Sequence, residues 1–204
     1  MASLKIVFFD LGDVVCDFVP DERLEAFTQL AGKSAEDLER AIWGSGFSSE
    51  CDEGRHSLDE MYVMIRELCG SALSDQVIQQ AWCKAFRLNR EVASVAQDVA
   101  RGVQVGLLTN NAPILRAAIP EAFPEIDLLF DPIFFSYDEF GVTKPSDDLF
   151  AQVERKTDRS SSELMLVDDS LKNIEAAASR GWQTVHYISV NELKADLGLS
   201  GLRL

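Results

Sequence analysis

The sequence predicts an α/β fold in which a doubly wound, mainly parallel sheet is interrupted near its first strand by a helical insertion. Five short apolar runs, rich in β-branched and aromatic residues, are spread along the 204-residue chain. Helical patterns separate most of these runs, which is typical of parallel strands buried on both faces. Between about residues 20 and 90 the strand-like runs are absent and helical patterns remain.

The sheet elements follow one another in a regular order. The first predicted strand covers residues 4–9, and Asp10 follows it. The later apolar runs cover residues 103–108, 132–135, 164–167 and 184–188. Apolar residues at 92, 95, 96 and 99 have helical spacing, and the helix predicted over residues 171–180 is closed by Gly181.

The insertion contains at least three predicted helices. Ser34 is a candidate N-cap, and Ser57 with Glu60 fits a capping box. A third helix carries Ile78 and Trp82 on one apolar face. The helices either pack into a single core with the sheet or form a cap over its edge. Because the chain enters the insertion just after Asp10, we favour the cap. We expect a core domain of residues 1–16 and 91–204 and a helical cap domain of residues 17–90.

Composition excludes several classes of protein. The net charge of −15 argues against nucleic acid or a membrane surface as a partner, because both are anionic. The four cysteines show no metal-binding spacing, so we expect small buried side chains in a reducing compartment. The sequence has no signal-peptide pattern and no apolar stretch long enough to span a bilayer, and we expect a cytoplasmic protein. The oligomeric state is not predicted.

Polar residues cluster where four predicted strands end. They are Asp10 after the first strand, Thr109 and Asn110 after the second, Lys144 beyond the third, and Asp168 with Asp169 after the fourth. Each has an ordinary alternative, since such residues also cap helices, form turns or face solvent. Ligands of open α/β sheets bind outside the carboxyl ends of the strands, so together these residues indicate one site.

The chemistry of this set suits phosphoryl transfer. Asp10, Asp168 and Asp169 supply hard oxygen ligands for Mg²⁺. Lys144 supplies a compact positive charge, and Thr109 together with backbone N–H groups can bind phosphate oxygens. The sequence therefore predicts a magnesium-dependent site that neutralises a phosphate ester.

The order of the four fragments "DLGDVV", "LLTNN", "TKP" and "LMLVDDSLKN" resembles the haloacid dehalogenase superfamily of hydrolases. The resemblance implies a Rossmann-like core with a helical cap. Within the superfamily, the segments "CDEGRHSLDE", "IPEAFPEID" and "FGVTKPSDDLF" are similar to the group of α-D-glucose-1-phosphate phosphatases and soluble epoxide hydrolase phosphatase domains.

For the metal and the nucleophile, the resemblance implies four positions. Asp10 would be the nucleophile, forming a phosphoaspartate, and also a Mg²⁺ ligand. The backbone carbonyl of Gly12 and the Asp169 carboxylate would be further ligands, and Asp168 would bind the metal directly or through water.

For the phosphoryl group, the resemblance implies that Thr109 and Asn110 bind it and that Lys144 stabilises its charge. Asn173 would orient the aspartate pair. The small-molecule substrate would be a phosphate ester selected by the cap, where Arg55 or Glu53 is placed to contact it.

One position departs from the family pattern. Most phosphatases of the superfamily carry a second aspartate two residues after the nucleophile, as acid and base, and here that residue is Gly12. Either Asp13 takes the role, or water or a cap residue does, or the leaving group needs little protonation. The last alternative fits a sugar 1-phosphate, whose anomeric hydroxyl is comparatively acidic.

Two other functions compete with a phosphatase. A 2-haloacid dehalogenase also uses an aspartate nucleophile and needs no acid at Gly12, although the pair Asp168 and Asp169 argues against it. A non-catalytic phosphate-binding regulatory module is the second alternative. His56 and His186 are expected to be structural or surface residues.

Overall fold

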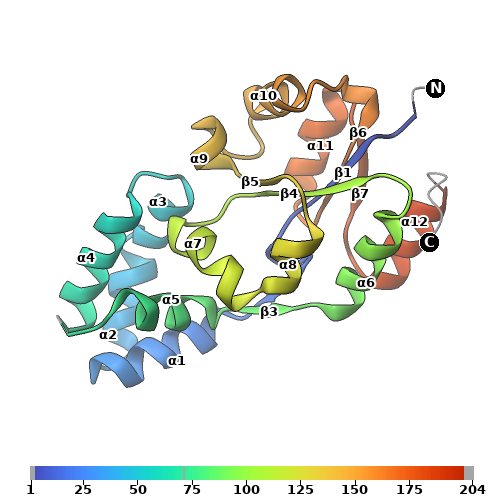
Figure 1. The fold of residues 1–204 in the computed structure, drawn as a ribbon. Coiled ribbons are helices and arrows are strands. Elements are labelled where there is room, and N and C mark those ends of the chain that lie inside the picture. Colours follow the sequence, from blue (N-terminus) through green and yellow to red (C-terminus); the bar gives the residue numbers. More distant parts are fainter. Residues whose placement is uncertain (1–2, 71, 200–204) are drawn as a thin grey trace.

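A five-stranded parallel sheet forms the centre of the molecule (Figure 1). The computed structural model describes residues 3–70 and 72–199. The strands lie in the order β5 (Ile133–Phe135), β4 (Gln104–Thr109), β1 (Ile6–Phe9), β6 (Leu164–Asp168) and β7 (Gln183–His186). Every neighbouring pair is parallel, with β1 in the middle. The predicted Rossmann-like, doubly wound α/β fold is confirmed.

The strands send alternate side chains into two separate hydrophobic clusters. In β1, Val7 and Phe9 belong to one cluster, and Ile6 and Phe8 belong to the other. Helices on the first face are α6 (Arg90–Val99), α7 (Pro113–Ala122), α8 (Pro124–Leu129) and α12 (Val190–Leu199). Helices on the second face are α10 (Asp147–Thr157) and α11 (Leu171–Ser179). The sheet is thus the middle of three layers.

The helical insertion leaves and rejoins the core through a two-stranded antiparallel ribbon. The ribbon pairs β2 (Cys16–Phe18) with β3 (Phe86–Leu88). Between them lie α1 (Pro20–Ala31), α2 (Ala35–Glu39), the π-helix η1 (Arg40–Gly44), α3 (Phe47–Asp52), α4 (Leu58–Cys69) and α5 (Asp75–Cys83). Two short helices, α9 (Ser136–Phe140) and the 3-10 helix η2 (Ser161–Glu163), complete the core.

Local capping chemistry explains where two insertion helices begin. The Ser34 side chain accepts a hydrogen bond from the Asp37 backbone N–H at the start of α2. Ser57 and Glu60 form the predicted capping box at the start of α4. Both predicted caps are therefore confirmed.

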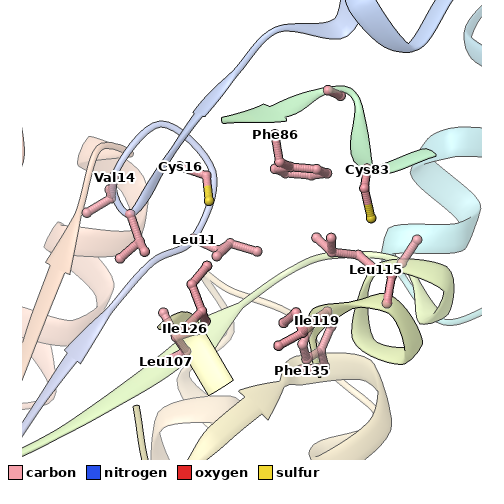
Figure 2. Packing of buried hydrophobic residues seen from close by; sticks show 14 of the residues in the cluster. Leu11, Val14, Cys16, Cys83, Phe86, Leu107, Leu115, Ile119, Ile126 and Phe135 are labelled. Carbon is pink, nitrogen blue, oxygen red and sulfur yellow. The ribbon is translucent and has the colours of Figure 1, made fainter. Parts of the chain in front are cut away.

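The insertion and the sheet share one continuous buried cluster. Figure 2 shows Cys83 and Phe86, at the end of the insertion, beside Leu11 and Leu115 of the core. The predicted boundaries at residues 16/17 and 90/91 fall at or beside the ribbon, and the division into two domains there stays a prediction. The shared cluster fixes the helices against the sheet face that carries Val7.

Two predictions from composition can be compared with the structure. All four cysteines are buried and unpaired, as expected. Within residues 3–70 and 72–199, no helix combines the length and the apolar character needed to cross a bilayer.

Candidate active site at the carboxyl edge of the sheet

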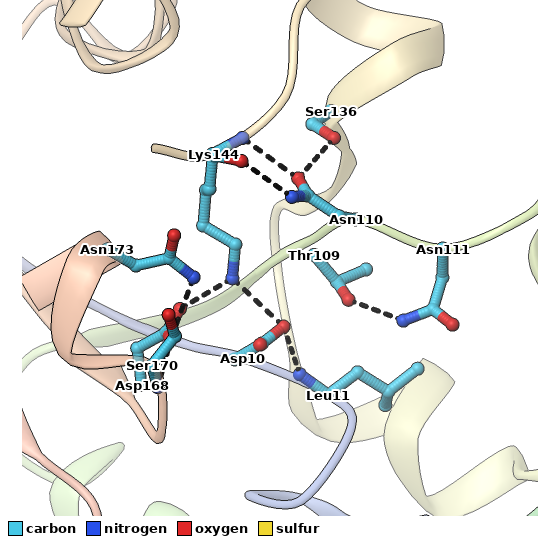
Figure 3. Close-up of polar contacts among 10 residues, drawn as sticks. All are labelled: Asp10, Leu11, Thr109, Asn110, Asn111, Ser136, Lys144, Asp168, Ser170 and Asn173. Atoms are coloured by element: carbon cyan, nitrogen blue, oxygen red, sulfur yellow. Dashed lines mark hydrogen bonds and ion pairs between the residues drawn. The ribbon is translucent and has the colours of Figure 1, made fainter. Parts of the chain in front are cut away.

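Three neighbouring strands bring the predicted residues to one edge of the sheet. Asp10 follows β1, while Thr109 and Asp168 are the last residues of β4 and β6. Thr109 and Asp168 were expected just beyond their strands, but both still pair with a neighbouring strand. Because β4, β1 and β6 are adjacent and parallel, their carboxyl ends meet (Figure 3).

Lys144 joins the two acidic strand ends. Its Nζ lies 3.0 Å from Asp10 Oδ1 and 2.6 Å from Asp168 Oδ2. The lysine is only 4% exposed, which excludes the alternative of a solvated surface residue. Burial opposes the charge, but the two carboxylates outweigh it and raise the pKa of Lys144. The ammonium group is therefore a fixed positive charge at the sheet edge.

Asp168 and Asp169 have opposite environments. Asp168 is fully buried, and its Oδ1 accepts hydrogen bonds of 2.9 Å from the Ser170 backbone N–H and from Asn173 Nδ2. Asp169 faces outward. This is the reverse of the alternative in which Asp168 faces water. His186 Nε2 lies 2.9 Å from the Asp169 backbone oxygen, in agreement with a structural histidine.

Asp10 is oriented by its own backbone and by the lysine. Its Oδ1 accepts a 2.7 Å hydrogen bond from the Leu11 N–H and contacts Lys144. Among the described residues both contacts fall on Oδ1, which leaves Oδ2 for a ligand. Burial raises the pKa of Asp10 to about 6; Lys144 opposes the rise and Asp168 adds to it. At pH 7 the carboxylate is still largely ionised.

The acidic residues fit a hard divalent cation. One carboxylate oxygen from each of Asp10, Asp168 and Asp169 lies within 4.8 Å of the others. Burial and the charge of Asp168 raise the pKa of Asp169, which is the repulsion that a bound cation would relieve. Since both Asp168 oxygens already accept hydrogen bonds, Asp169 is the freer ligand.

Asn110 supports the lysine loop with its side chain. Its Nδ2 donates to the Lys144 carbonyl at 3.0 Å, and its Oδ1 accepts from the Lys144 N–H at 3.0 Å. Ser136 Oγ also donates to that oxygen, at 2.7 Å. The side chain of Asn110 is therefore committed to positioning Lys144, and only its backbone remains for the predicted phosphoryl contact.

Thr109 keeps a hydroxyl proton available. Its Oγ1 accepts a 2.8 Å hydrogen bond from Asn111 Nδ2, and its own O–H donates to no side chain or backbone oxygen of residues 3–70 and 72–199, which leaves it for a ligand. Sequence reasoning missed the contributions of Asn111 and Ser136. Both follow strand ends, but no spacing distinguishes them from ordinary turn and helix-start residues.

Three predicted residues make none of the contacts described above for this cluster. Gly12 is in the turn after β1, where its backbone pairs with that of Cys16 in a single parallel β-bridge. Asp13 is exposed, and its Oδ1 accepts a 3.1 Å hydrogen bond from the Phe18 N–H. Arg55 is also exposed; it pairs with Glu53 at 2.6 Å and lines a cavity of about 640 Å³ between the α3–α4 loop and helices α7 and α9. Neither the Asp13 nor the Arg55 side chain joins the described contacts of Lys144.

Comparison with known proteins decides the family. The model of haloacid dehalogenase-like hydrolases matches residues 4–181, which include all four strand ends. The chain belongs to the haloacid dehalogenase-like hydrolase family. It is accordingly a hydrolase, as its strand ends predicted.

Relatives of this haloacid dehalogenase-like hydrolase extend over nearly its whole length. D-Ribitol-5-phosphate phosphatase from Bacteroides thetaiotaomicron is 28% identical over 187 residues, covering 89% of this chain and 90% of that protein. A sesquiterpene phosphatase from Aspergillus oryzae is 29% identical over 188 residues, covering 90% of each.

A solved structure agrees with the fold of this family member. It is a haloacid dehalogenase family enzyme from Bacteroides thetaiotaomicron in complex with magnesium and inorganic phosphate. The TM-score is 0.75 at 23% identity, over 90% of this chain and 93% of that one.

Proposed function

We propose that this hydrolase is a magnesium-dependent phosphatase that transfers the phosphoryl group of a small phosphorylated metabolite to Asp10. The observation that carries the proposal is the position of Lys144 Nζ, within 3.0 Å of both Asp10 and Asp168 at the joint edge of three strands. A fixed ammonium group beside a nucleophilic carboxylate suits an anionic substrate. The two phosphatases among its relatives support the same activity.

In the proposed mechanism, three side chains of this protein contact the phosphoryl group. Asp10 Oδ2 attacks phosphorus, while the Thr109 hydroxyl and Lys144 Nζ stabilise charge on the phosphoryl oxygens. The bond from phosphorus to the leaving oxygen breaks, and that oxygen takes up a proton. Water then hydrolyses the acyl phosphate, which releases phosphate and restores Asp10.

The metal ligands in this proposal are Asp10, the Gly12 carbonyl and Asp169, with Asp168 bound directly or through water. A bound Mg²⁺ supplies positive charge that lets a carboxylate approach a phosphate dianion. The cluster of three carboxylates, with oxygens within 4.8 Å of one another, supports this assignment. Magnesium and phosphate in the similar Bacteroides structure accord with it.

For the substrate we propose a sugar phosphate, with sugar 1-phosphates favoured. Gly12 offers no carboxylate to protonate the leaving oxygen, and the anomeric oxygen of a sugar 1-phosphate needs protonation least. Arg55 lines the cavity beside α7 and is the proposed contact for the sugar.

A hydrolysis screen over phosphorylated metabolites, with Mg²⁺ and with EDTA, tests the proposal. The panel includes glucose 1-phosphate, ribitol 5-phosphate and a 2-haloacid. We expect phosphate release that requires Mg²⁺ and falls to background in Asp10→Asn. Halide release that survives EDTA would indicate a dehalogenase instead. Phosphate binding without hydrolysis of any ester would indicate a regulatory module.

A further inference from the structure

The proposed phosphatase lacks a proton donor beside its nucleophile. Gly12 has no side chain, and the Asp13 carboxylate accepts a hydrogen bond from the Phe18 N–H at the start of the insertion. The backbone of Asp13 also has a positive φ of 54°. A leaving oxygen less acidic than an anomeric one, such as that of an ordinary alcohol, therefore needs a proton from another group.

Helix α3 brings a carboxylate to the start of α7, just after the turn that follows β4. Asp52 is the last residue of α3, and the Ala112 backbone N–H is close enough to lower the pKa of its carboxyl group. Ala112 follows the turn that carries Thr109 and precedes α7, and Figure 1 shows α3 next to the start of α7. The Asp52 carboxylate is thus joined to the segment that supplies the proposed phosphoryl contacts.

The direction of the reaction also favours this side of the site. In-line transfer puts the leaving oxygen opposite the attacking oxygen. Asp10 attacks from the strand end, so the leaving oxygen departs away from the sheet, toward the helices of the insertion. The loop after α3 is seated against the core there, because Gly54 packs directly on Tyr137 of α9.

The surroundings of Asp52 suit proton transfer. Asp52 is half-buried, and the positive charge of Arg23, which is 2% exposed, acts on its carboxyl group. Arg23 donates from Nε to the Trp82 carbonyl at 2.9 Å, and its guanidinium carbon lies 4.1 Å from the Trp82 ring centroid. Burial raises the pKa of Asp52 to about 7, against the opposing effects of Arg23 and the Ala112 N–H and with a small addition from Glu53. A carboxyl group that titrates near neutral pH serves as both acid and base.

We propose that Asp52 is the general acid and base of the reaction, replacing the carboxylate that is missing at position 12. This inference rests on the proposed phosphatase function. As Asp10 displaces the leaving oxygen, the Asp52 carboxyl gives its proton to that oxygen and becomes a carboxylate. The carboxylate then takes a proton from the water that attacks the phosphoaspartate.

The first test compares Asp52→Asn with the wild type on two esters. The asparagine can still accept the Ala112 N–H but has no proton to exchange. For ribitol 5-phosphate, with a poor leaving group, kcat/KM is expected to fall about 100-fold. For p-nitrophenyl phosphate, whose leaving group needs no proton, the fall is smaller by at least about tenfold. Asp59→Asn, the same change at an exposed carboxylate in the first turn of α4, is the matched control and should leave the ratio of the two values unchanged.

The second test moves the carboxyl group back to position 12. A Cβ added at Gly12 meets nothing within 4 Å, so Gly12→Asp is sterically allowed. The double variant Gly12→Asp/Asp52→Asn should have a kcat/KM on ribitol 5-phosphate at least about tenfold higher than that of Asp52→Asn alone.

Wild-type enzyme provides a readout that needs no variant. Its kcat/KM should depend only weakly on leaving-group acidity across alkyl and aryl phosphates, because protonation assists departure. A steep dependence would overturn the proposal, as would an equal loss on both esters in Asp52→Asn, no loss, or no rescue by Gly12→Asp. Activity that survives in Asp10→Asn would instead overturn the underlying phosphatase mechanism.

Discussion

At the scale of single residues, the site is held by one buried cation between two carboxylates. Lys144 contacts Asp10 and Asp168, and its backbone is fixed by Asn110. Strand ends alone predicted the grouping of Asp10, Lys144 and Asp168. They did not predict that the Asn110 amide turns toward the lysine loop, because that depends on how the loop after α9 folds back.

The raised pKa of Asp10 predicts a pH-dependent cost to the folded state. Burial lifts the pKa from 3.8 to about 6, so the folded chain binds this proton more tightly than the unfolded chain. The stabilising contribution is present below about pH 4 and is lost as the pH rises through about 6. We compare the free energies of unfolding of Asp10→Asn and the wild type without Mg²⁺. The difference, variant minus wild type, should increase by up to about 3 kcal/mol between pH 4 and pH 7.

Urea unfolding of both proteins at a series of pH values, in EDTA, measures this difference. A difference that stays constant from pH 4 to pH 7 would show that Asp10 titrates in the folded protein as it does in the unfolded one.

At the scale of elements, continuous apolar runs and long helical patterns were predictable, and short segments without either were not. The apolar runs predicted all five strands of the sheet to within two residues at each end. The ribbon of β2 and β3 was missed because a charged residue, Asp17 or Arg87, interrupts each of its strands. Helix α3 was missed because six residues are too few to show a helical period, and Asp52 was missed with it. Its place beside Ala112 results from packing between segments about 60 residues apart in the sequence.

The loop after α3 supplies a prediction at this scale. Gly54 has φ of 71°, and a Cβ there would lie 2.4 Å from Tyr137 Cβ. Gly141 has a similar φ of 67°, but nothing lies within 4 Å of its Cβ position. Both Gly→Ala changes carry a backbone cost of about 1 kcal/mol, and Gly54→Ala also displaces the loop from α9. We expect Gly54→Ala to lower the free energy of unfolding by about 2 kcal/mol more than Gly141→Ala.

Urea unfolding of the two variants side by side tests this contact, and the phosphatase assay reports its effect on the site. Equal losses of stability would mean that the loop moves away from Tyr137 at no cost, so that the contact does not hold α3 over the sheet edge.

At the scale of the whole molecule, a strongly acidic chain buries one positive charge among the carboxylates of its proposed site. The net charge is −15, yet Lys144 is buried at the sheet edge among the predicted metal ligands. A divalent cation there would neutralise the remaining carboxylates locally. The fold class and the strand-end chemistry followed from the sequence, whereas the side chains that the insertion brings to the site required the three-dimensional arrangement.

The central claim is that Asp10 becomes a phosphoaspartate during turnover. The most direct measurement is acid quenching of the working enzyme with Mg²⁺ and substrate, reduction with borohydride, and mass spectrometry of the peptide that contains residue 10. Borohydride converts an aspartyl phosphate into homoserine, so we predict homoserine at position 10 only when both substrate and Mg²⁺ are present. An unmodified Asp10 in enzyme that is visibly releasing phosphate, or homoserine at another carboxylate, would contradict the account.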